Sequence, residues 1–350
     1  MDALALSAKE ALEGNRADAI SFVQTSGVRR TRELLQGAAG DLKKKIAAKV
    51  KSGHGETFTL AQMRTTLAQV QDSLKFVVRG MHDTILDVGD DAAQQSAEHT
   101  IEYLKKVDRA FRGIGTSPLP IREASMLDEA TQGVRSSILR RLASSGEPIE
   151  GADEEPSPAK LGVLERYGVE TIDHFEGEMR KGLVAKKSWG EMQDSLIERS
   201  PFLQGAPAHW AERIVRTEVM GAYARSSWET IREADDQFGD MTKFLCATFD
   251  DRTGADSYVV HGQCRRPEQA FASWYGFFQH PPARPNDREV VVPHRISWPR
   301  PPYLFPMPRS AAQLRWRMQG NKKPMPPTPL ITTVSFALFG KKEPPKLDNP

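Results

Sequence analysis

Apolar residues recur at intervals of three and four positions through most of the chain up to Gly239, a pattern that predicts one helix after another. The clearest stripe runs from Leu60 to Met81 and alternates the two spacings over about three heptads. Thr59 and Gln62 offer a capping box at its start. Such a stripe must bury against another helix, either in this chain or in a second copy, and the intramolecular core is the commoner use. Self-association therefore stays open.

Two further stripes follow, at residues 97–111 and 127–142, before the pattern stops. The segment from Ser144 to Pro158 is polar and acidic, contains three prolines and has no apolar periodicity, which indicates a linker. We therefore expect an N-terminal helical domain at residues 1–143, a linker at 144–158, a second domain at 159–300 and a proline-rich C-terminal arm at 301–350.

Helical spacing resumes at Val169, and Ser188 with Glu191 forms a second candidate capping box. A long helix is expected from Pro207 to Asp235, and β-prone runs at Phe244–Phe249 and Val290–Val292 predict two strands. Prolines are frequent after Trp298, so beyond it we expect only a short helix near residues 311–318 and an extended tail after Gly320. The predicted fold is mainly α, with a small α+β C-terminal subdomain.

Composition narrows the function classes only a little. A formal net charge of +2 from 48 basic and 46 acidic residues gives no general reason to expect nucleic-acid binding. Two cysteines, Cys246 and Cys264, are too few for a disulfide scaffold or a four-thiolate zinc site. No signal peptide is evident, and the longest apolar run, near Ile331–Gly340, is about half of what a membrane-spanning helix needs. We expect a protein that does not span a membrane.

Four short motifs follow one another between Ala211 and Pro299. A helix carries Arg216-Thr217-Glu218 and Ala222-Tyr223-Ala224, a strand leads into Asp250-Asp251-Arg252-Thr253, and Ser257 and His261-Gly262-Gln263 precede the closing segment Pro281–Arg288. In this order the motifs resemble the Mu-F-like, or SPP1-type, head-morphogenesis domain of tailed phages. The resemblance covers about a quarter of the chain.

The resemblance implies a low-copy head protein that is bound near the portal during assembly and is in some cases associated with packaged DNA or its ejection. Many members carry a Cys-x-x-Cys pair and a closing Cys-Arg-Cys that look like metal ligands. Here Gly254 and Ser257 stand in place of the first pair, and Asn286-Asp287-Arg288 closes the motif without cysteine. A tetrahedral zinc site needs about four nitrogen or sulfur ligands. We therefore expect neither a structural metal nor a cofactor.

The charged residues of these motifs have two interpretations. Either Arg216 or Arg252 pairs with Glu218 or Asp251 and ties the long helix to the strand and loop, while His261 bonds to backbone in a turn and Gln263 helps to organise the same unit. Or Asp250, Asp251 and His261 serve a metal-dependent nuclease or peptidase. Charge networks are often structural. The favoured role of Arg216, Glu218, Asp251, Arg252, His261 and Gln263 is accordingly architectural, with no catalytic residue.

The segment Ile331–Phe339 is β-prone and apolar between charged, proline-rich flanks, and such a segment is costly to leave exposed. Strand addition to a partner, or a return to its own domain, would cover it. We favour a partner contact through Val334, Phe336, Leu338 and Phe339. Basic clusters such as Lys43-Lys44-Lys45 could touch DNA phosphates, although a solvated helix face is the commoner explanation.

The expected function is that of a minor head (capsid) protein of a tailed phage, not an enzyme. Its expected location is the virion, in the head interior or near the portal, after synthesis in the bacterial cytoplasm. The expected partners are the portal protein, the major capsid protein or both, and packaged DNA is a further candidate.

Overall fold

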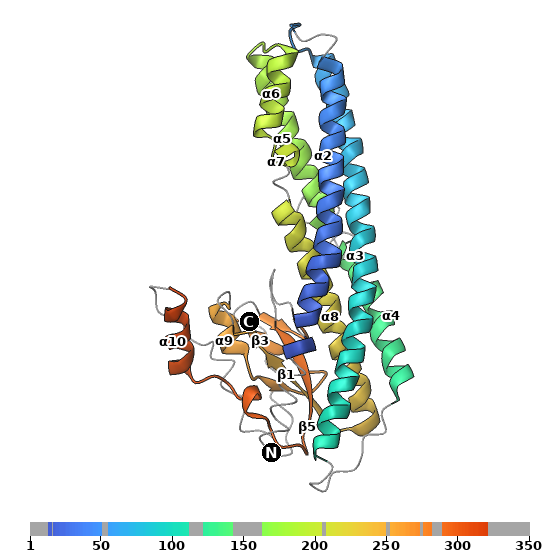
Figure 1. Ribbon diagram of the computed structural model, residues 1–350, viewed down its shortest axis with the longest axis vertical. Helices are drawn as coiled ribbons and strands as arrows, with labels where there is room; N and C mark the ends of the chain where they lie inside the picture. The colour runs from blue at the N-terminus through green and yellow to red at the C-terminus, as the bar shows by residue number, and fades with distance from the viewer. Residues whose placement is uncertain are drawn as a thin grey trace, which may run out of the picture. The chain divides into compact units, whose positions relative to one another are not determined.

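A computed structural model describes residues 13–15, 17–50, 55–111, 122–142, 163–204, 208–249, 253–273, 276–281 and 289–320. The protein is mainly helical, with a few short antiparallel strands near the C-terminal end of the described chain, as the sequence predicted (Figure 1). The elements are a π-helical turn η1 (Val23–Val28), α2 (Arg29–Val50), α3 (Leu60–Phe111), α4 (Glu123–Leu142), α5 (Val163–Val184), α6 (Trp189–Arg199), α7 (Pro201–Gln204), α8 (Ala208–Phe238), β1 (Met241–Cys246), α9 (Ala255–Val260), β2 (Cys264–Arg265), β3 (Phe271–Ser273), β4 (Gly276–Phe278), β5 (Val290–Arg295), a 3-10 turn η4 (Pro302–Leu304) and α10 (Arg309–Met318).

The chain divides into two compact units that are each built from separate segments. Unit 1 combines residues 1–19, 93–133 and 220–350, and unit 2 combines residues 20–92 and 134–219. Helices α3, α4 and α8 each contribute residues to both units. Each unit draws on residues from both sides of the expected linker at 144–158, so this division differs from the expected linear series of domains. The linker itself lies outside the described residues.

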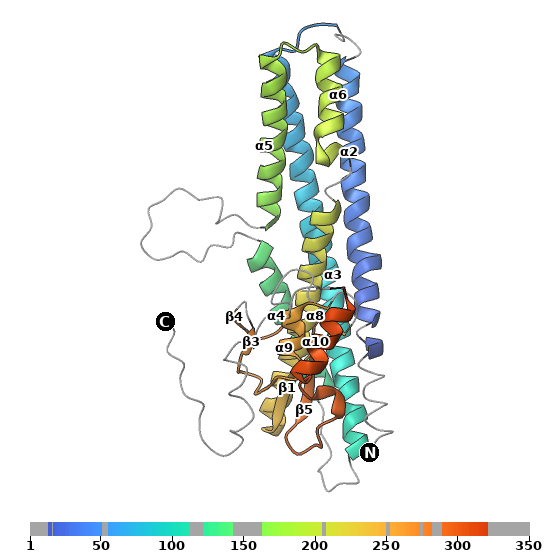
Figure 2. The ribbon, with the colours of Figure 1, turned by 90° about the vertical axis from the view of Figure 1, so that its left-hand side faces the viewer.

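Unit 2 is a helical bundle in which the predicted stripe of α3 is buried. Met63, Val70, Leu74, Val77 and Met81 are all core residues, whereas Leu60 in the first turn is exposed. The stripe packs inside the chain: a Cβ built on Gly80 would lie 2.7 Å from the Leu34 side chain of α2, so the two helices touch at that point. Figure 2 shows α2, α5 and α6 running alongside one another in this unit.

Both predicted capping boxes are present in unit 2, and their helix starts are joined. Thr59 and Gln62 exchange side-chain and backbone hydrogen bonds at the start of α3, and Ser188 and Glu191 do the same for α6. The backbone N–H of Phe58 donates to the carbonyl of Lys187, 2.8 Å away. The segment before α3 is thereby held against the turn that separates α5 from α6.

Unit 1 packs the end of α3 and most of α8 against a three-stranded sheet. The strand order is β2-β1-β5, and β1 is antiparallel to both neighbours, with Phe244 opposite Cys264 on one side and Val292 on the other. The two helices approach closely, because Ser226 donates to the carbonyl of Ala93 at 2.6 Å. The core of the unit is formed by apolar residues of α3, α8 and the strands, among them Leu104, Ile231, Leu245, Phe271 and Val292.

The predicted order of long elements is confirmed, and the differences concern short ones. The stripes 60–81 and 97–111 belong to one continuous helix, α3. Strand β1 begins three residues before the predicted Phe244 and ends at Cys246, and β5 includes Pro293 at the edge of the sheet, where a missing N–H is tolerated. The short elements α9, β2, β3 and β4 were not predicted, because segments of two to six residues carry too little periodicity.

Candidate functional site

The sequence motif His261-Gly262-Gln263 forms a buried turn in unit 1 between α9 and β2. His261 follows the last residue of α9, and its Nδ1 accepts a hydrogen bond from the backbone N–H of Ala247 at 3.2 Å. The ring also meets Phe249 edge-on, with centroids 4.5 Å apart. Because Nδ1 is an acceptor, the neutral imidazole carries its proton on Nε2. The expected backbone bond of His261 in a turn is confirmed.

Gly262 is the position in this turn that admits no side chain. Its φ is +77°, in the left-handed region that favours glycine. A Cβ built there would lie 2.6 Å from the nitrogen of Pro306 and 2.8 Å from the carbonyl oxygen of Leu304, both backbone atoms. Its own N–H donates to the carbonyl of Leu245 at 2.7 Å. The turn therefore locks β1 to the segment around η4.

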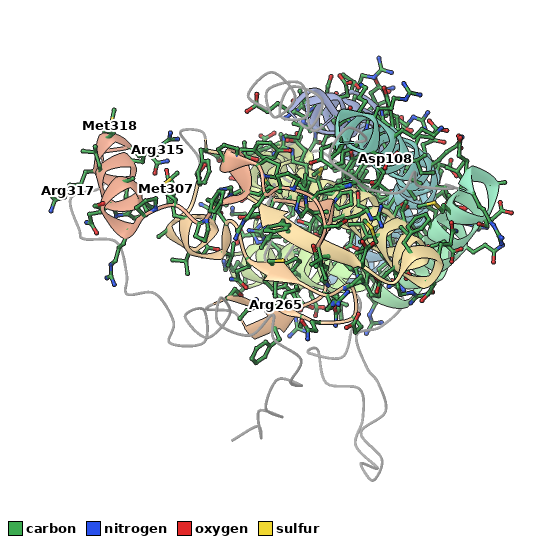
Figure 3. The ribbon with its side chains drawn as sticks, turned by 90° about the horizontal axis from the view of Figure 1, so that it is seen from below. Asp108, Arg265, Met307, Arg315, Arg317 and Met318 are labelled. Atoms are coloured by element: carbon green, nitrogen blue, oxygen red, sulfur yellow. The ribbon has the colours of Figure 1, made fainter. Side chains whose placement is uncertain are left out.

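Gln263 links the turn to β3. Its side-chain amide donates to the carbonyl of Ala272 at 2.7 Å, and its side-chain oxygen accepts from the N–H of Ala272 at 3.1 Å. Arg265, labelled in Figure 3, donates from Nη2 to the same Gln263 oxygen at 3.3 Å and from Nε to the carbonyl of Ala270 at 3.1 Å. The buried Gln263 side chain thus serves as a short strand residue between two sheets that share no backbone ladder.

Arg300 holds the other side of the turn. Its Nη2 donates to the carbonyls of Gly262 at 2.8 Å and Leu304 at 2.6 Å. The guanidinium carbon also lies 4.6 Å from the ring centroids of both Phe244 and Phe305. A planar cation between two aromatic faces is stabilised by the ring quadrupoles, and its N–H groups satisfy backbone acceptors at the same time.

Lys243 brings a positive charge into the interior beside this turn. The residue is fully buried on β1, and its Nζ donates to both the backbone and the side-chain oxygen of Gln279 at 2.8 Å. The same nitrogen lies 4.8 Å from the ring centroid of Phe271 and 5.7 Å from that of Trp228. Burial lowers the pKa of Lys243 to about 7 from its ordinary value.

Two buried carboxylates lie on the segments that flank the turn. Asp256 is in the first turn of α9, and Glu289 immediately precedes β5. The hydroxyl of Ser257, one of the motif residues, donates to Glu289. In the described parts of the chain, no group of three or more His, Cys, Asp or Glu side chains is placed to hold a metal ion.

The residues expected at the architectural site fall into three groups. His261 and Gln263 lie in unit 1 and share the turn described above. Arg216 and Glu218 lie on α8 in unit 2. Asp251 and Arg252, together with Asp250, lie outside the described residues, as do Arg284–Arg288 and the arm residues Val334, Phe336, Leu338 and Phe339.

The expected pairing of Arg216 with Glu218 or Asp251 is replaced by another. Arg216 Nη2 lies 3.2 Å from a carboxylate oxygen of Glu212, one helical turn earlier on α8. Residues four apart share a helix face, whereas residues two apart do not, so Glu212 is the accessible partner. Glu212 also receives Arg32, so two cations share this buried carboxylate. The alternative pairing through Arg252 stays a prediction.

Arg300 and Lys243 are the residues of the site that the sequence did not indicate. Arg300 stands in a proline-rich stretch, and Lys243 stands in a strand where every neighbour is buried. A lysine inside an apolar β-prone run is a usable signal, because lysine is almost never fully buried unless its charge has partners.

None of the helices in the described residues is both long enough and apolar enough to cross a membrane.

Comparisons of the chain with protein-family models, with curated proteins and with solved structures give no match.

Proposed function

We propose that the protein is a minor head component of a tailed phage that acts in head assembly by docking on another head protein near the portal, with no chemical turnover. One observation carries the proposal: the chain holds four motifs in the order of the Mu-F-like domain, and one of them, His261-Gly262-Gln263, forms a buried structural turn. In this turn the histidine, the glycine and the glutamine each make a backbone contact that builds the fold.

The chemistry of the turn supports an architectural use. The Nδ1 lone pair of His261 is taken by the N–H of Ala247, and the Gln263 amide is taken by Ala272. A general base or a metal ligand needs a ring nitrogen that can reach a substrate or an ion. The described contacts of these two side chains are those of a scaffold that presents other surfaces to partners.

The test is co-sedimentation of the purified protein with the portal protein and the major capsid protein of the same phage. We expect binding to the portal that a truncation before Lys322 weakens, because the truncation removes Ile331–Phe339. Asp251→Ala should leave that binding intact. Failure to sediment with either head protein would contradict the proposal.

The enzymatic alternative has its own test. Duplex DNA and a casein substrate are incubated with the protein and Mg²⁺, Mn²⁺ or Zn²⁺. Turnover that Asp251→Ala abolishes, with an unchanged far-UV circular dichroism spectrum, would favour a nuclease or peptidase that uses Asp250, Asp251 and His261. The role expected from the head-assembly proposal is absence of turnover with all three ions.

A further inference from the structure

Helix α10 is attached to unit 1 through one of its faces. Ala312 is buried in a small apolar cluster with Ala255 and Tyr258 of α9. Gln319, just beyond the helix, donates from its side chain to the hydroxyl of Tyr258 at 3.1 Å. The guanidinium of Arg315 lies 5.3 Å from the ring centroid of Phe249. These contacts fix the orientation of α10 and therefore determine which residues point away.

The outward face of α10 carries an apolar pair. Leu314 is 60% exposed and Met318 is 79% exposed, and a spacing of four residues places them side by side on one face of the helix. Figure 3 shows Met318 and Arg317 at the edge of the molecule, directed away from the rest of unit 1. Adjacent exposed apolar side chains on a fixed helix are the usual anchors by which a helix enters a groove of a partner.

Charge gives the second feature of this face. Arg309, Arg315 and Arg317 lie on α10, the helix has no acidic residue, and in the sequence Lys322 and Lys323 follow before the next acid, Glu343. A cationic helix of this kind is complementary to a partner surface bearing carboxylates. Methionine and arginine are also enriched at protein interfaces.

We propose that the outward face of α10 docks into an apolar groove, rimmed by carboxylates, on the partner head protein. Leu314 and Met318 enter the groove, and Arg317 pairs with an acid at its rim. This inference rests on the proposed function and assigns the docking contact of the described chain to one helix.

A protein groove fits the face better than nucleic acid does. Phosphate binding needs positive charge and gains little from exposed leucine and methionine, whereas these two side chains supply apolar area to a groove. A fully buried Leu or Met side chain contributes about 1.5–3 kcal/mol relative to leaving it in water. The apolar pair is therefore the discriminating feature, and the arginines set the sign of the partner.

The experiment measures binding of immobilised portal protein to the full chain and to three pairs of variants. Leu314→Gln with Met318→Gln removes the apolar pair while glutamine keeps the helix propensity. Its matched control is Phe277→Gln with Ile296→Gln, which removes two other exposed apolar side chains of unit 1. Arg317→Glu is compared with Arg109→Glu, an exposed arginine on α3 in the same unit.

We expect the α10 double variant and Arg317→Glu each to weaken binding about tenfold or more, and both controls to bind as the wild type does. Binding of the wild type that the α10 variants leave unchanged would overturn the inference and leave the head-assembly function standing. No binding of the wild type to the portal or the major capsid protein would contradict the function itself and this inference with it.

Two further readouts close the remaining outcomes. Retention on duplex DNA that Arg317→Glu abolishes and the α10 double variant does not would overturn the inference in favour of a phosphate contact. A lower thermal unfolding temperature of the α10 double variant alone would mean that the chain itself covers Leu314 and Met318, which would also overturn it. An unchanged unfolding temperature together with weakened portal binding supports it.

Discussion

The side chain of Gln263 makes both of the hydrogen bonds that a neighbouring strand would make with the backbone of Ala272. The three-stranded sheet and the β3–β4 hairpin share no backbone ladder, so this amide is a polar bridge between them. Both partners are buried, and buried backbone groups left unpaired carry the full desolvation cost. The motif residue therefore has a structural reason for its identity.

Replacement of Gln263 by methionine should destabilise the protein strongly. Methionine keeps the length of the side chain but leaves the N–H and the carbonyl of Ala272 without their described partner. Each such buried group costs about 1–3 kcal/mol, so we expect a loss of about 2–4 kcal/mol in the free energy of unfolding, measured by urea denaturation. Gln36→Met, at an exposed position on α2, is the control and should change stability little. A Gln263→Met protein as stable as the wild type would contradict the bridging role.

Gly262→Ala should be far more damaging than a glycine substitution at a similar backbone angle. Gly239 has a φ of +71°, close to the +77° of Gly262, but a Cβ built on Gly239 meets no atom within 4 Å. Gly239→Ala should therefore cost only the left-handed penalty of about 1–2 kcal/mol. Gly262→Ala adds a collision with the backbone of Leu304 and Pro306, which cannot move aside as a flexible side chain could. Urea unfolding of both variants measures the difference, and equal losses would show that the close approach at Gly262 is unimportant.

Lys186→Gly should stabilise unit 2. Lys186 follows α5 with a φ of +53° and is the one non-glycine residue with positive φ in the described chain. The N–H of Lys187 bonds to the carbonyl of Gly182 and that of Lys186 to the carbonyl of Leu183, which is the Schellman arrangement in which glycine is preferred. Relief of the left-handed strain should raise the free energy of unfolding by about 1 kcal/mol.

The control for that substitution is a glycine inside a helix. Lys45→Gly, at an exposed position on α2, should lower stability by about 1 kcal/mol because glycine is a poor helix former. Thermal unfolding of the two variants should therefore shift in opposite directions. A lower unfolding temperature for Lys186→Gly would contradict the expectation.

The long helices could be predicted from the sequence because their apolar spacing repeats over many residues. The stripe that includes Leu74 and Met81 marks a buried face, and both side chains are in the core. The capping residues Ser188 and Glu191 were predicted as well, since that signal is local. What spacing cannot supply is the assignment of α3 and α8 to two units each, because this depends on contacts between distant segments.

The candidate site could be predicted only in part. His261 and Gln263 were singled out, and both form the turn, yet the partner of Gln263 lies on β3, a strand of three residues with no readable pattern. Arg300 was missed because its carbonyl acceptors, Gly262 and Leu304, come together only through the fold. Arg216 was paired with the wrong carboxylate, because an acid one helical turn away was overlooked in favour of one in the motif.

Lys243 should make stability depend on pH in the alkaline range. Its pKa is about 7 in the folded protein, because burial disfavours the charged amine, while an unfolded lysine titrates near its ordinary value of 10.5. Below pH 7 the amine is protonated in both states, and above about 10 it is neutral in both. Between these limits the unfolded state binds more protons, so the free energy of unfolding rises with pH by up to about 1.4 kcal/mol per unit.

The measurement is urea unfolding at intervals from pH 7 to 10 for the wild type, Lys243→Met and the exposed control Lys45→Met. Only Lys243→Met should lose the upward slope, because methionine fills the same apolar space without a titrating group. The other alkaline groups, such as Tyr103 with its hydroxyl bonded to Tyr303, are common to all three proteins and cancel in the comparison. If Lys243→Met kept the wild-type slope, the two oxygens of Gln279 and the rings of Phe271 and Trp228 would be holding the amine charged throughout this range.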